Sequence, residues 1–206
     1  MTNSQDVAAS TSTSIHAQQG EAQPALVLVN LGTPTAPEPG PVRAFLREFL
    51  SDRRVIEMSP LLWKPILEGI ILRVRPREVA AKYRSIWMEE GSPLMHYTRE
   101  QARRLGERLP GVRVEVAMRY GQPSIGSVLD RLNAEGVRRV AILPAYPQYA
   151  ASTVATINDA VASWIGRNRD GFELRLHRSF PAAPAYIEAL ATALERHWEQ
   201  VGLPNF

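Results

Sequence analysis

The chain of 206 residues is 45% hydrophobic and 22% charged, which is the composition of a globular protein with one sizeable core. Its formal net charge is only +3 and its basic residues are interspersed with acidic ones, so we expect no nucleic-acid partner. The absence of cysteine excludes disulfides, thiolate metal ligands and a thiol nucleophile, and it agrees with a cytoplasmic location.

Residues 1–23 are polar and rich in Ser, Thr, Ala and Gln, without the apolar core of a signal peptide. This segment also lacks Lys and Arg, so it differs from a mitochondrial transit peptide. We therefore expect a disordered tail ahead of the folded chain.

Residues 24–182 alternate strand and helix patterns. The apolar run from Ala25 to Val29 predicts a strand buried on both faces. Further strands are predicted at 112–121, 137–147 and 172–180. Helices are predicted at 41–51, 61–74, 77–86, 98–108 (with Thr98 as its N-cap), 124–136, 153–165 and 183–201. This alternation predicts an α/β domain over residues 24–182, an open parallel sheet with right-handed crossovers and helices on both faces.

The most apolar helical segment is 61–74, which begins at Leu61 and ends at Val74. Lys64, Pro65 and Glu68 interrupt it, and it is shorter than the roughly 20 residues of a membrane span. We expect it to lie on a membrane surface or to line the mouth of a pocket.

Polar and aromatic residues follow the predicted strands at their carboxyl ends, where open parallel sheets bind ligands. Tyr120, Tyr146 and Tyr149 offer rings and hydroxyls to a planar, mostly apolar ligand. Arg119 suits a carboxylate, and the backbone amides after Ser152 and Thr153 suit an anion.

Each of these residues also has a purely structural interpretation. Ser152 or Thr153 is a natural N-cap for the next helix, tyrosines at strand ends pack against the core, and a single arginine is commonly a surface charge. The chain contains neither the GxGxxG nor the GxxxxGK[ST] phosphate motif, and its four histidines have no metal-ligand spacing. Only His177 falls at the predicted carboxyl edge.

Four segments in order, ALVLVNLGTP, KYRSIWMEEGSPLMHYT, AMRYGQPSI and LPAYPQYAASTVATIND, resemble the amino-terminal part of a ferrochelatase. The resemblance extends from Pro24 to the end of the chain and implies a chelatase-like α/β half. It implies insertion of Fe(II) into protoporphyrin IX to form protohaem, with both as substrates and no tightly bound cofactor. The implied porphyrin-binding residues are Leu31, Arg119, Tyr120, Tyr146, Tyr149, Ser152 and Thr153. Segment 61–74 would be an apolar lip with peripheral membrane contact.

The essential histidine of the family, in a motif of the SxHGxP type, and its partner glutamate belong to the second half. The chain ends at Phe206 before either motif, and His177 and His197 match neither. We therefore expect no catalytic residue and no metal ligand in this chain, and no activity of the chain alone. We expect residues 183–206 to form a crossover helix toward a missing second domain. Two alternatives remain: a half-size chelatase that forms a homodimer, and a non-catalytic tetrapyrrole-binding module.

Overall fold

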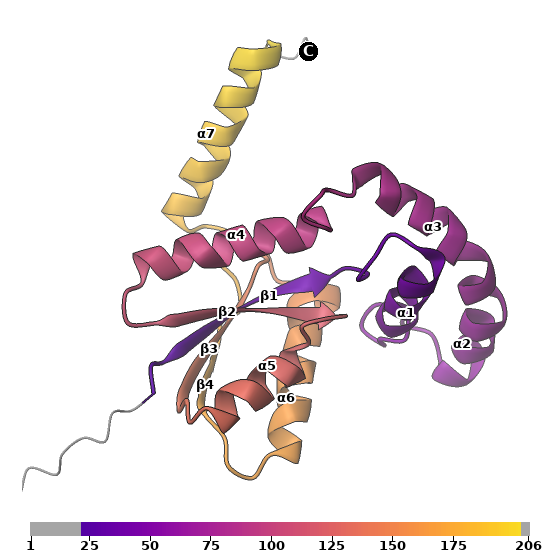
Figure 1. Ribbon diagram of the computed structural model, residues 1–206, viewed down its shortest axis with the longest axis horizontal. Helices are drawn as coiled ribbons and strands as arrows, with labels where there is room; N and C mark the ends of the chain where they lie inside the picture. The colour runs from indigo at the N-terminus through magenta and orange to yellow at the C-terminus, as the bar shows by residue number, and fades with distance from the viewer. Residues whose placement is uncertain (1–21, 203–206) are drawn as a thin grey trace, which may run out of the picture.

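The computed structural model describes residues 22–202 and contains a four-stranded parallel sheet flanked by helices (Figure 1). The predicted tail lies almost wholly outside the described residues. The strands are β1 (Ala25–Gly32), β2 (Arg113–Tyr120), β3 (Arg139–Pro144) and β4 (Glu173–Leu176). Their order in the sheet is β2-β1-β3-β4, with every neighbouring pair parallel. The predicted α/β fold is confirmed, although β1 is longer and β3 and β4 are shorter than expected.

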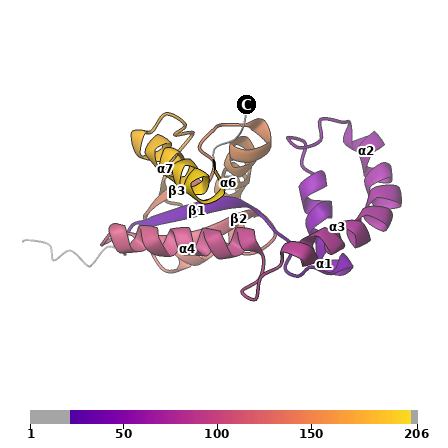
Figure 2. The same cartoon turned by 90° about the horizontal axis from the view of Figure 1, so that it is seen from above.

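Helices cover both faces of the sheet (Figures 1 and 2). Helix α4 (Pro93–Arg108) lies on one face, and helices α5 (Ile125–Ala134) and α6 (Thr156–Arg167) lie on the other. This distribution follows from right-handed crossovers in a sheet whose strand order reverses at β1. The main core fills the layer between the sheet and α5 and α6, where Trp164, Leu129 and Ile142 are buried.

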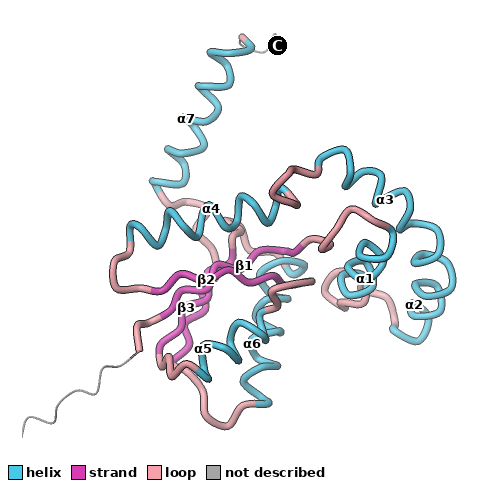
Figure 3. Tube along the Cα trace, in the orientation of Figure 1, coloured by secondary structure: helices cyan, strands magenta, loops and turns pink. Residues whose placement is uncertain are grey.

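A helical lobe lies beyond the carboxyl ends of the strands (Figure 1). It consists of α1 (Pro39–Leu50), α2 (Pro60–Ile66), the π-helical turn η1 (Leu67–Ile71) and α3 (Leu72–Ile86). The last three form one continuous helical run (Figure 3), so the prediction of two separate helices at 61–74 and 77–86 is wrong. Pro76 lies inside α3 and is buried, although proline usually ends or kinks a helix.

Helix α7 (Pro184–Val201) corresponds to the helix predicted at 183–201 and extends away from the sheet (Figure 1). None of its described residues is buried. Its large apolar side chains Ile187, Leu190, Leu194 and Val201 are exposed and fall on one side of the helix. Whether this helix leads to a second domain stays a prediction.

Candidate functional site

The strand order places a topological switch point between β1 and β3. The connection after β1 leads to α4 on one face of the sheet, and the connection after β3 leads to α6 on the other. Open α/β sheets bind ligands in a crevice at such a point, so the candidate crevice is the region between the carboxyl ends of these two strands. The Ala145 N–H donates to the Val29 carbonyl at 2.8 Å, so the segments that carry Leu31 and Tyr146 leave the sheet side by side at this edge.

Asn30 fixes the end of β1. Its Oδ1 accepts the Leu31 N–H at 2.8 Å, and its Nδ2 donates to Thr98 Oγ1 at 2.9 Å. Thr98 in turn donates to the Leu94 carbonyl at 2.6 Å. Thr98 is therefore a buried link between α4 and β1, and its prediction as an N-cap is wrong, because α4 begins five residues earlier at Pro93.

Tyr146 lies at the edge of the main core, beside the candidate crevice. Its ring packs against the main core, and its buried hydroxyl forms no hydrogen bond with the residues described. Burial, with a smaller contribution from nearby Tyr120, raises the pKa of Tyr146. Leu31, Tyr120 and Tyr146 thus lie close together beside the candidate crevice, with the Tyr120 side chain and the Tyr146 hydroxyl buried.

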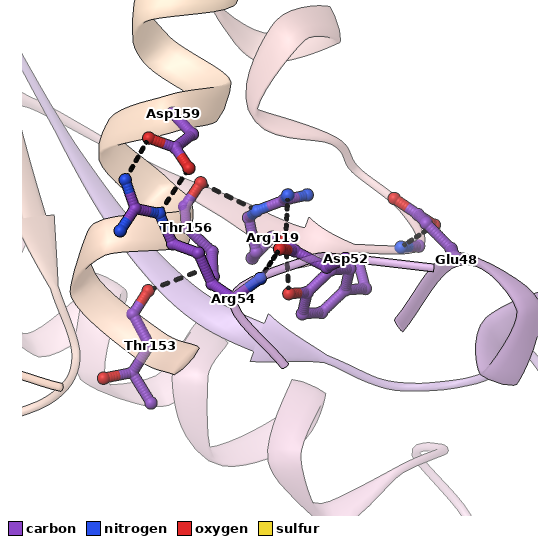
Figure 4. Close-up of polar contacts among 9 residues, drawn as sticks. Glu48, Asp52, Arg54, Arg119, Thr153, Thr156 and Asp159 are labelled. Atoms are coloured by element: carbon purple, nitrogen blue, oxygen red, sulfur yellow. Dashed lines mark hydrogen bonds and ion pairs between the residues drawn. The ribbon is translucent and has the colours of Figure 1, made fainter. Parts of the chain in front are cut away.

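Arg119 is already paired within the chain (Figure 4). Its Nε donates to the Thr156 carbonyl at 2.8 Å, and its Nη2 donates to Asp52 Oδ2 at 2.5 Å. Its guanidinium carbon lies 4.4 Å from the centre of the Tyr120 ring. The positive charge of Arg119, which we expected to pair with a ligand carboxylate, is therefore largely neutralised by Asp52.

Tyr120 is fully buried at the end of β2 and shares the same carboxylate. Its hydroxyl donates to Asp52 Oδ2 at 2.9 Å, and its ring meets Phe49 of α1 edge to face at 5.2 Å between centres. Burial is the main reason that the pKa of Tyr120 rises to about 12. The phenol therefore remains a neutral hydrogen-bond donor at any physiological pH.

Three charged residues around Arg119 and Tyr120 were not predicted from the sequence. Asp52 and Arg54 come from the loop between α1 and α2, and Asp159 comes from α6. Arg54 forms a bidentate ion pair with Asp159, in which its Nη2 donates to Oδ1 at 2.8 Å (Figure 4), and this holds the pKa of Asp159 below its usual value. The only sequence signal is the SDRR run at 51–54, a dense group of charges between two helices.

Thr153, Ser152 and Tyr149 lie farther along the segment after β3. Residues 152 and 153 fall inside the π-helical turn η2 (Ala151–Ala155), which follows Ala150 and has no side-chain cap, so the N-cap interpretation of both is wrong. Thr153 Oγ1 donates to the Ala150 carbonyl at 3.3 Å, and its own carbonyl accepts from Thr156 Oγ1 at 2.9 Å. Thr153 is thereby linked to the Arg119 cluster.

Tyr149 and Ser152 form the outer rim. Tyr149 is 41% exposed, and the Arg178 guanidinium carbon lies 4.2 Å from the centre of its ring. Ser152 is exposed, and its side chain makes no hydrogen bond within residues 22–202. The structure therefore separates the predicted residues into an inner wall and a solvent-facing rim.

Neither a metal cluster nor a transmembrane helix is found in the part of the chain that the structure describes. Between residues 22 and 202, no three His, Cys, Asp or Glu side chains come together as a metal site would require. His177 is exposed after β4, with its ring 5.8 Å from that of Phe180. Within the same range, every helix is too short or too polar to cross a bilayer.

The chain is similar to ferrochelatases over nearly its whole length. The family model described as Ferrochelatase matches residues 23–205. Ferrochelatase 1 of Shewanella oneidensis is 50% identical over 182 residues, which cover 86% of this chain and 54% of that protein. The ferrochelatase of Methylibium petroleiphilum is 49% identical over 191 residues (91% and 53%), and that of Stenotrophomonas maltophilia is 48% identical over 178 residues (86% and 55%). The chain thus spans about half the length of these relatives.

Proposed function

Because the chain belongs to the ferrochelatase family, we propose that it supplies the porphyrin-binding half of an enzyme that inserts Fe(II) into protoporphyrin IX, forming protohaem. The observation that carries the proposal is the convergence of Leu31, Tyr120 and Tyr146 at the switch point between β1 and β3. Porphyrin and Fe(II) are substrates in this proposal, and no tightly bound cofactor takes part.

The inner wall and the rim have different roles in this proposal. Leu31 and Tyr146 contact the face of the macrocycle, since apolar and aromatic surfaces suit a flat ring. Arg119 and Tyr120 close the inner end of the crevice, and Thr153 holds the turn beside them. Tyr149 and Ser152 lie where the ring edge meets solvent.

Metal insertion also requires a base that removes two pyrrole N–H protons near neutral pH. Histidine is the side chain whose ordinary pKa, about 6.5, suits that task. The candidate wall contributes two tyrosines with raised pKa values and an Arg119 that is paired with Asp52, and it contributes no histidine. We therefore expect this chain to bind and orient porphyrin without inserting metal by itself.

A titration of the purified 206-residue chain with protoporphyrin IX, followed by Soret absorbance and fluorescence, tests the proposal. We expect saturable binding in a one-to-one ratio, and no Zn(II) or Fe(II) insertion above the rate without protein. The same chain fused to the carboxyl-terminal half of the Methylibium ferrochelatase should insert metal. A wild-type chain that binds no porphyrin contradicts the proposal.

Two alternatives predict different outcomes of the same assays. A half-size homodimeric chelatase would insert metal without the fusion and would lose activity in His177→Ala. The exposed apolar side of α7 favours this alternative, because it offers an association surface. A non-catalytic tetrapyrrole-binding module would bind porphyrin, and its fusion would remain inactive.

We further propose that the lobe contacts a membrane surface through segment 61–74. Leu61 is 87% exposed, and Leu62, Ile70 and Val74 are also exposed large apolar residues. Such a short apolar patch supports peripheral contact rather than insertion across the bilayer. An apolar substrate dissolved in the bilayer would then meet the lobe at the membrane surface.

A further inference from the structure

Asp52 is the most heavily engaged acidic side chain at the candidate site. Its side chain is only 9% exposed, and it accepts three hydrogen bonds. Oδ2 accepts from Arg119 Nη2 at 2.5 Å and from the Tyr120 hydroxyl at 2.9 Å, and Oδ1 accepts the Arg54 backbone N–H at 2.8 Å. These donors replace the water that a nearly buried carboxylate has lost.

The same carboxylate joins three segments that are distant in the sequence. Asp52 lies in the loop between α1 and α2, Arg119 and Tyr120 end β2, and Arg119 is also bonded to Thr156 at the start of α6 (Figure 4). The Arg54–Asp159 pair holds the same loop to α6 from the outside. These bonds hold Arg119 and Tyr120 in one orientation.

We propose that Asp52 is a positioning residue of the porphyrin cleft, which holds Arg119 and Tyr120 in one orientation and reserves Arg119 for the protein rather than for a substrate carboxylate. This inference rests on the proposed function. It assigns the two propionate carboxylates of the porphyrin to other groups, and it makes Arg119 part of the wall that shapes the cleft.

The charge-neutral variant Asp52→Asn tests the proposal with two ligands, protoporphyrin IX and its dimethyl ester. Asparagine keeps the shape of the side chain but loses the charge that holds Arg119. If Asp52 acts by positioning, both ligands should bind about tenfold more weakly, the effect of losing one charged hydrogen bond from an ordered wall. If Asp52 only masks Arg119, the diacid should instead bind more tightly and the ester should be unaffected, which would overturn the proposal.

A double-mutant cycle shows whether Asp52 acts through Arg119. In an Arg119→Gln background, Asp52→Asn should cause at most a twofold further loss of affinity, because the charged partner is already gone and an asparagine oxygen can still accept from the Tyr120 hydroxyl. Asp52→Asn alone leaves the buried charge of Arg119 without its partner, which could impair folding. The double variant removes both charges, so its affinity can still be compared with that of Arg119→Gln. A full tenfold additional loss in that background would show that Asp52 acts independently and would overturn the proposal.

Trypsin gives a readout that needs no porphyrin, since Arg53 and Arg54 are themselves cleavage sites in the loop that Asp52 holds. Asp52→Asn should accelerate cleavage after these residues about tenfold through local opening of the loop. Asp170→Asn is the matched control: its side chain is exposed, and it forms no hydrogen bond or ion pair with another residue between 22 and 202. Unchanged cleavage in Asp52→Asn contradicts positioning, whereas a wild-type chain that binds neither ligand contradicts the proposed function instead.

Discussion

Gly32 and Tyr120 pair across β1 and β2 at a separation that excludes any side chain on Gly32. A Cβ built on Gly32 would lie 1.8 Å from the Tyr120 carbonyl oxygen, and the φ of Gly32 is +115°. Both the contact and the dihedral require glycine. This close approach sets Leu31, the preceding residue, beside the Tyr120 end of the candidate cleft.

Gly32→Ala should lower the free energy of unfolding by about 3 kcal/mol or more, because strain in φ adds to a backbone clash that no rotamer relieves. Urea unfolding followed by circular dichroism measures the change. Gly166→Ala is the control, since Gly166 lies in α6 with nothing within 4 Å of the added methyl, and alanine there should stabilise by roughly 0.5–1 kcal/mol. A Gly32→Ala chain as stable as the wild type would contradict the close pairing.

Alkaline pH should destabilise the chain through Tyr120. An unfolded tyrosine ionises near pH 10, whereas Tyr120 in the folded chain holds its proton until about pH 12. Because the folded pKa is raised, the stabilisation is complete below pH 10 and is lost as the pH rises toward 12. Phenolate absorbance at 295 nm should show a late-titrating phase that is smaller in Tyr120→Phe. Tyrosines that all ionise near pH 10 while the chain is still folded would refute this.

The lobe should bind vesicles through its apolar residues. Replacing Leu61 and Leu62 by Glu should weaken co-sedimentation with phosphatidylglycerol-containing vesicles by at least tenfold, since two apolar contacts become charges. Ile165→Glu is the control, because Ile165 is an exposed apolar residue of α6 outside the lobe. Equal losses in both variants would mean that the lobe has no special role.

The apolar side of α7 should cause the chain to self-associate at high concentration. Leu190→Glu should shift the mass measured by light scattering toward the monomer, because the exposed stripe is then interrupted by a charge. Ala189→Glu adds the same charge on the opposite side of the helix and should leave the mass unchanged. A wild-type chain that is monomeric at every concentration would argue against an association surface on α7.

The sequence predicts the sheet and the carboxyl-edge location of the site because both follow from local patterns. Apolar runs define the strands, and alternation with helices makes them parallel. The partner of Arg119 could not be predicted in this way. Asp52 and Arg119 are 67 residues apart in the sequence, and nothing in either local segment specifies that they meet.

Predictions of helix N-caps from the sequence fail in this chain where tertiary contacts give the side chain another hydrogen-bond partner. Thr98 has the chemistry of an N-cap, yet it lies inside α4, which begins at Pro93, and there it accepts a hydrogen bond from Asn30. Ser152 and Thr153 likewise lie within a π-helical turn, a departure from regular geometry that often occurs near functional sites.

The central position of β1 has a consequence for synthesis of the chain. Ala25 pairs with Arg113 on one edge and with Val140 on the other, so both edges of the first strand remain unpaired until far more of the chain has been made. Such non-local pairing slows folding, and an apolar strand with open edges is prone to pair with other chains. The nascent chain is therefore most vulnerable to aggregation in the interval before β3 leaves the ribosome, and a holdase chaperone that covers β1 should improve the yield of folded protein.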